Sequence, residues 1–178
     1  MGPITYSLCK APVIGLVMFA TGLCAVPAPI QWQRIHFEEQ GNILTTPFEA
    51  SVDKPYPLFL RFTFNNKEDY DRDQIVGKQY CLHNTKYSEV PVAHRSSYGQ
   101  PIPLRVVITK EPKSSVVLDE TFHSICAETN AGKNRKQRLI TDIALERGHY
   151  SIQVFNLQPF PDFRNVITEV GLMGGRGK

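Results

Sequence analysis

Hydrophobic and polar residues alternate in short runs along most of the chain, which is the pattern of β-strands that bury one face. The clearest run covers residues 56–64, where every even-numbered position is leucine, tyrosine or phenylalanine. Runs at 102–110 and 116–122 flank a short turn that contains a proline, so they predict a hairpin. Runs at 139–145 and 150–155 flank a glycine turn, and they predict the central hairpin of the fold.

The same pattern predicts a core. Tyr150 follows Gly148 by two residues, which is typical of a sandwich corner where the ring packs inward and the hydroxyl reaches the backbone. Further strands are expected at 43–52 and 166–173, with an edge strand within 31–41. The inward positions that we expect to form the core are Leu58, Leu60, Phe62, Leu104, Val106, Tyr150, Ile152 and Val154.

This arrangement indicates an all-β chain. About seven or eight short strands without an alternating helix rhythm predict an antiparallel β-sandwich, immunoglobulin-like or C2-like, with one short helix. We expect that helix through residues 72–76, because acidic residues precede it and Gly77 follows it.

A targeting segment precedes the strands. Lys10 is followed by an uncharged run to residue 30, whose most apolar part is 13–20, and this predicts a secretory signal peptide. Cleavage is expected after Ala25 or after Cys24. Lipidation of Cys24 and an uncleaved anchor are the alternatives, although the prolines of this run argue against a spanning helix.

The expected division of the chain follows from these patterns. A signal peptide covers 1–25, a leader segment 26–41, the β-sandwich domain 42–173 and a flexible tail 174–178. The expected location is the periplasm or cell envelope, with membrane contact only through a lipid anchor or an uncleaved signal.

Charge changes this picture little. The net charge is +3, from 20 Lys and Arg against 17 Asp and Glu, so we expect no nucleic-acid partner. One basic cluster stands just before a strand, and we expect it to be a solvated loop rather than a phosphate or lipid headgroup site. Its members are Lys133, Arg135, Lys136 and Arg138.

Cysteines and histidines supply the candidate chemistry. Cys81 and Cys126 are the two cysteines after the targeting segment, and in an exported protein they are expected to form a disulfide or, alternatively, to remain buried thiols. A hydrolase or zinc-dependent enzyme using His83, His94 and His123 is the alternative function. Neither paired Cys-x-x-Cys spacing nor a Gly-x-Ser-x-Gly motif is present, so we expect no enzyme and no cofactor.

The segment 79–100 is the least regular part of the pattern, and long irregular loops often carry function. Aromatic residues and arginine dominate interface hot spots, so this segment is the candidate binding surface. Its candidate residues are Tyr87, His94, Arg95 and Tyr98. A lid packed over an open end of the sandwich is the alternative interpretation.

Four segments stand out in this order along the chain: PLFLRFTF at 57–64, DQIVG at 73–77, PIPLRVVI at 101–108 and LERGHYSIQV at 145–154. Together they resemble a known bacterial family of domains of unknown function, numbered 5625. The resemblance, which covers about residues 42–171, implies a small exported sandwich protein, and it transfers no catalytic residues. We therefore expect a non-catalytic envelope protein that binds a secreted toxin, as an immunity protein does, or another envelope protein.

Overall fold

The computed structural model describes residues 28–77, 87–125, 127–128 and 132–174. The expected signal peptide, and with it Cys24, lies outside these residues. So do Cys81, His83 and Cys126, and their predictions stay predictions. Within the described ranges, no helix is both long and apolar enough to span a membrane.

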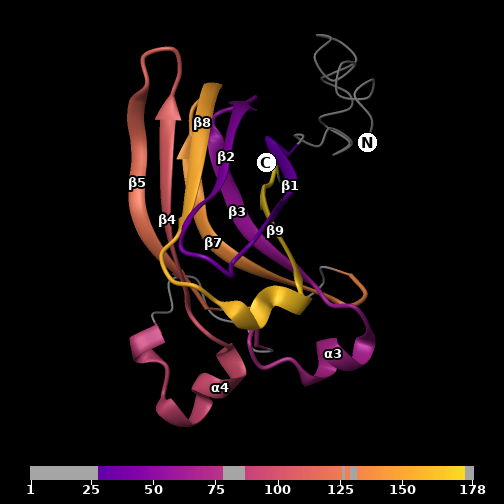
Figure 1. The fold of residues 1–178 in the computed structure, drawn as a ribbon. Helices are drawn as coiled ribbons and strands as arrows, with labels where there is room; N and C mark the ends of the chain where they lie inside the picture. The colour runs from indigo at the N-terminus through magenta and orange to yellow at the C-terminus, as the bar shows by residue number, and fades with distance from the viewer. Residues whose placement is uncertain (1–27, 78–86, 126, 129–131, 175–178) are drawn as a thin grey trace, which may run out of the picture.

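Two antiparallel sheets pack face to face and confirm the predicted β-sandwich (Figure 1). The five-stranded sheet has the order β1 (Ile30–Ile35), β9 (Ile167–Leu172), β3 (Lys54–Thr63), β7 (Arg135–Leu145) and β6 (Ala127–Glu128). The four-stranded sheet has the order β2 (Gly41–Ala50), β8 (Gly148–Asn156), β4 (Ile102–Lys110) and β5 (Ser115–Ser124). β1 is thus an edge strand within the segment that we expected as a leader.

The core lies between the sheets and consists of the positions that the alternation predicts. All eight expected core residues are buried, because each strand turns alternate side chains toward the other sheet. The structure adds Phe163 from the 3-10 helix η3 (Pro161–Asn165), whose ring stacks on Phe62 with centroids 5.3 Å apart.

One predicted hairpin is confirmed and the other is wrong. β4 and β5 pair with each other, as the sequence predicts. β7 and β8 do not pair, because β7 joins β3 in one sheet while β8 joins β2 and β4 in the other. The connection from β7 to β8 therefore passes from one sheet to the other. It is stabilised by a hydrogen bond of 2.9 Å from the Tyr150 hydroxyl to the carbonyl of Glu146. A glycine turn between two amphipathic strands suits either connection, so the local pattern could not distinguish them.

Strand β7 carries a bulge that the sequence pattern did not predict. Thr141 pairs with Leu58, but the next residue of β3, Phe59, pairs with Leu139. Ile140 is therefore the extra residue, and the alternation of inward and outward side chains changes phase there.

The change of phase turns two basic side chains inward. Before the bulge Lys136 and Arg138 are buried, whereas after it the odd-numbered Ile143 is buried. The expectation of a solvated basic loop holds for Lys133 and Arg135, which are exposed, and is wrong for Lys136 and Arg138.

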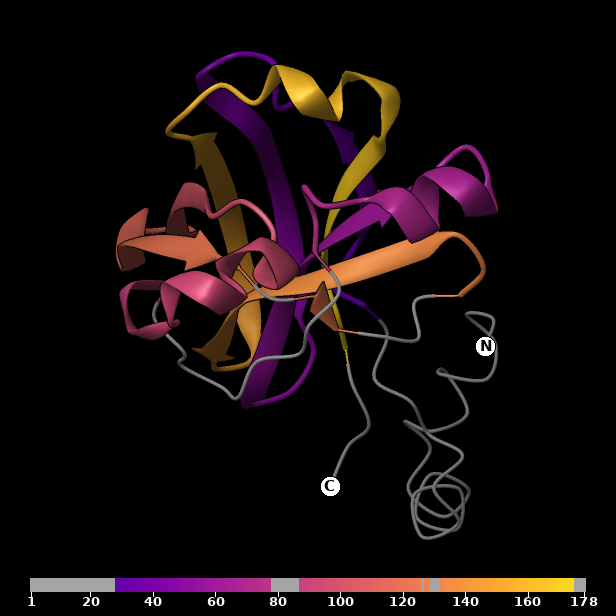
Figure 2. The same cartoon turned by 90° about the horizontal axis from the view of Figure 1, so that it is seen from below.

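The predicted helix at 72–76 is also displaced. Helix α3 covers Lys67–Arg72 instead, and the Asn66 side chain caps it by accepting from the amide of Asp69 at 2.8 Å. The chain leaves the helix at Asp73, whose carboxylate bonds the following amides and so favours a turn. A second short helix, α4 (Arg95–Tyr98), lies at the same end of the sandwich (Figures 1 and 2).

Candidate functional site

The four candidate binding residues lie in one helical segment at this end of the sandwich. The segment, which we call the cap, covers residues 87–98 and consists of η1 (Tyr87–Glu89), η2 (Val92–His94) and α4. Figure 2, which views the molecule from this end, shows the cap beside the ends of the strands.

Two of the candidate residues hold the shape of the cap. The Nε of Arg95 donates to the carbonyl of Val90 at 3.0 Å, and the Arg95 guanidinium lies 5.2 Å from the centroid of the Tyr87 ring. Val90 itself is buried, at 3% exposed. Tyr87 and Arg95 therefore contact each other, and both support the segment that carries the tip.

The tip of the cap, residues 91–94, faces solvent. Val92 is 77% exposed, the largest exposed fraction among the described exposed large hydrophobic residues, and Pro91, Ala93 and His94 are exposed beside it. The tip is nevertheless ordered by local bonds, since the amide of His94 donates to the carbonyl of Pro91 at 2.8 Å. The Ser97 hydroxyl donates to the carbonyl of His94 at 2.6 Å. An apolar side chain is thus presented on a constrained backbone.

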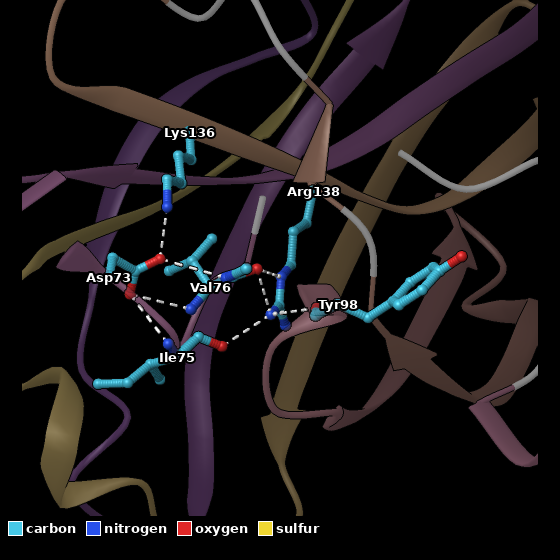
Figure 3. A network of polar contacts seen from close by, with 7 residues as sticks. Asp73, Ile75, Val76, Tyr98, Lys136 and Arg138 are labelled. Carbon is cyan, nitrogen blue, oxygen red and sulfur yellow. Dashed lines mark hydrogen bonds and ion pairs between the residues drawn. The ribbon is translucent and has the colours of Figure 1, made fainter. Parts of the chain in front are cut away.

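The cap is attached to the sandwich through a buried arginine (Figure 3). The guanidinium of Arg138 is fully buried and donates to the carbonyls of Val76 at 2.6 Å, Ile75 at 2.9 Å and Tyr98 at 3.3 Å. It also donates to the carbonyl of Gln100 at 2.7 Å. The carbonyl of Tyr98 faces this network, while its ring points away.

The pKa of Arg138 reflects its surroundings. Burial lowers this pKa to about 9, because desolvation disfavours the charged form, and the negative charge of Asp73 opposes the shift. At neutral pH the guanidinium is charged and all of its N–H groups are available as donors.

A buried ion pair lies next to this arginine. The Asp73 carboxylate accepts a hydrogen bond of 2.6 Å from the Lys136 ammonium. It also accepts hydrogen bonds of 3.0 to 3.2 Å from the backbone amides of Ile75, Val76 and Gly77. The ammonium also lies 5.0 Å from the Tyr70 ring centroid and 5.3 Å from that of Phe64. Asp73 therefore fixes the turn whose carbonyls Arg138 binds.

Sequence reasoning missed these three charged residues. Lys136 and Arg138 were assigned to the surface because the bulge in β7 is not visible in the pattern. Asp73 offered a signal, since an aspartate side chain can bond the amides that follow it and so favours a turn, but the pattern was interpreted as a helix.

The histidines are distributed over different elements. His94 is exposed on the tip and His123 is exposed on β5. Within the ranges that the structure describes, no group of three or more His, Cys, Asp or Glu side chains could hold a metal ion.

An open hollow of about 540 Å³ lies along residues 34–43, between β1 and β2. One connecting segment lines it, and its His36 side chain is largely exposed, 3.7 Å from Glu38. A ligand pocket usually encloses most of its ligand, which this open hollow does not, so we take the cap as the candidate site.

The comparison with protein families agrees with this fold. The family model DUF5625, a domain of unknown function, matches residues 29–174. The chain belongs to this family. The matched range begins ahead of β1 and ends after β9, so the DUF5625 domain includes both sheets.

The fold of this DUF5625 protein is similar to a crystal structure from Sulfurospirillum deleyianum. The TM-score is 0.61 at 17% sequence identity, and the match covers 83% of this chain and 98% of that one. At this identity the similarity concerns the fold. No curated protein matches the sequence.

Proposed function

We propose that this DUF5625 protein is a non-catalytic protein-binding module of the bacterial envelope, and that the tip of its cap makes the contact. The observation that carries the proposal is the exposed Val92, held on a backbone that is constrained by hydrogen bonds within the cap. A partner that covers this side chain removes apolar surface from water, which favours the association.

The constrained backbone of the cap supports a role in binding. A surface that is already constrained loses less conformational entropy when it associates, so more of the contact energy appears as affinity. The partner that fits this tip is a protein with an apolar pocket for Val92 and a polar rim near His94. A secreted toxin, neutralised by this protein, is the partner class that we favour, since the sequence predicts export.

Capture from an envelope fraction tests the proposal. Purified wild-type protein is compared with Val92→Asp, which places a charge in the proposed contact. The matched control is Val116→Asp, because Val116 is also an exposed valine, at 62%, but lies on β5 away from the cap. We expect both variants to melt like wild type.

The expected result is a protein that wild type and Val116→Asp retain and that Val92→Asp loses. Tyr87→Ala and Arg95→Ala should weaken the same capture, because both side chains hold the cap in shape. A protein retained equally by Val92→Asp and Val116→Asp would exclude the tip as the contact surface.

A further inference from the structure

Two described segments meet where the cap adjoins the sandwich, and together we call them the neck. The neck consists of residues 75–77 on one side and 98–100 on the other, and the amide of Gln100 donates to the carbonyl of Ile75 across it at 2.8 Å. Glycine is required on both sides, because a Cβ at Gly77 would overlap the backbone of Tyr98 and one at Gly99 would overlap that of Ile75. Both glycines also have positive φ, 82° and 74°.

One side chain bridges the two sides of this neck. Arg138 donates to carbonyls on the near side, at residues 75 and 76, and on the far side, at residues 98 and 100. It also donates to the carbonyl of Ser124 at the end of β5, at 3.0 Å. The Asp73–Lys136 pair supports the near side, where the Asp73 carboxylate accepts the amides of Val76 and Gly77.

We propose that Arg138 is the positioning residue of the cap: it closes the neck and so determines how the tip is held against the sandwich. Any effect of this positioning on the binding of a partner at the tip rests on the proposed function, but the positioning role itself does not. Burial of a guanidinium is unfavourable unless each of its N–H groups donates a hydrogen bond. Here the acceptors are backbone carbonyls of the two sides of the neck and of Ser124.

A lysine cannot replace this arginine. A guanidinium offers five N–H donors in one plane, whereas an ammonium offers three from a single point. Arg138→Lys therefore keeps the positive charge but leaves part of the neck carbonyls without a donor, so the cap should open more often than the sheets do.

Amide hydrogen exchange on the full chain measures this opening. The exchange of residues 87–100 is compared with that of β8, which lies in the middle of the sandwich. Arg138→Lys should raise exchange in the cap at least about tenfold more than in β8, since one lost buried hydrogen bond already has nearly this effect.

Two control variants separate positioning from general stability. Arg61→Lys is the same substitution at a partly buried arginine that pairs with Glu169 on the outer face of β3 and β9, and it should leave the cap unchanged. Leu60→Ala weakens the core and should raise exchange in the sheets as well as in the cap. If Arg138→Lys does not fold, Gly77→Ala is compared in the same way, because a Cβ at this position overlaps the backbone of Tyr98 and Gly99 across the neck.

The results distinguish the two proposals. The positioning role is wrong if Arg138→Lys, or Gly77→Ala in its place, raises exchange in β8 as much as in the cap. Selective opening of the cap supports the positioning role. Binding of the protein identified by the Val92 comparison should weaken only as far as the fraction of molecules with a closed cap falls. Selective opening together with equal capture by Val92→Asp and Val116→Asp would support the positioning role and exclude the tip as the contact surface.

Discussion

The substitution Asp73→Asn tests the buried charges in the most direct way. It conserves the shape of the side chain and removes its negative charge. One oxygen of Asp73 accepts the amides of Ile75 and Val76, and the other accepts the amide of Gly77 and the ammonium of Lys136. In asparagine an NH₂ group, itself a donor, replaces one of these two oxygens. In either orientation of the side chain, the two donors that this oxygen accepted then lose their acceptor and stay buried without a partner.

The size of the effect follows from this geometry. Removing one partner of a buried ion pair costs about 3–5 kcal/mol, because the remaining charge stays buried without its counterion. The side chains of Asp73 and Lys136 are 3% and 5% exposed, so water cannot replace the lost contact without structural change. For a domain of this size, such a loss lowers the melting midpoint by roughly 6–20 °C.

The assay is thermal unfolding followed by circular dichroism, with two further variants. Asp119→Asn is the matched control, since Asp119 pairs with Arg105 on the exposed surface of β4 and β5, and its midpoint should stay near that of wild type. The double variant Asp73→Asn/Lys136→Met removes the unpaired ammonium and should melt above Asp73→Asn alone. Equal midpoints for Asp73→Asn and Asp119→Asn would refute the reasoning.

Three other predictions concern the core, the surface and export. Leu60→Ala should reduce the free energy of unfolding in urea by about 2–5 kcal/mol, and wild-type stability would contradict the core assignment. The hydrogen bonds from Arg105 lower the pKa of Asp119, so this exposed pair should add a small stabilisation above the unfolded pKa of the carboxyl. The small difference in unfolding free energy between wild type and Asp119→Asn should therefore vanish as the pH falls through the folded pKa. Intact mass from an envelope fraction should show a chain that begins near Val26, or at a lipidated Cys24, and a full-length cytoplasmic species would argue against export.

The candidate site was predictable only in part. The irregular pattern around Tyr87 and Tyr98 indicated the segment that forms the cap, because no strand or helix period continues through it. The residues that hold the cap were not predictable in this way. Arg138 looked like a surface residue, and its role depends on carbonyls that are 14 to 63 positions away in the chain.

The sequence by itself determined the strands and the core. Alternation with a period of two is a local property, so Leu58, Leu60 and Phe62 could be assigned to one buried face without knowledge of their neighbours. The same local pattern placed Tyr150 inside and its hydroxyl on the backbone at the corner. These features need only the preference of apolar side chains to leave water.

Tertiary structure decided which strands pair and where the phase of the pattern changes. β7 and β8 are joined by a turn that suits a hairpin, yet each finds its hydrogen-bond partners in a different sheet. The bulge at Ile140 arises from pairing with β3, and it turns Arg138 from the surface into the interior. Both outcomes depend on contacts between residues far apart in the chain, and the free energy of those contacts is not encoded in any local stretch of sequence.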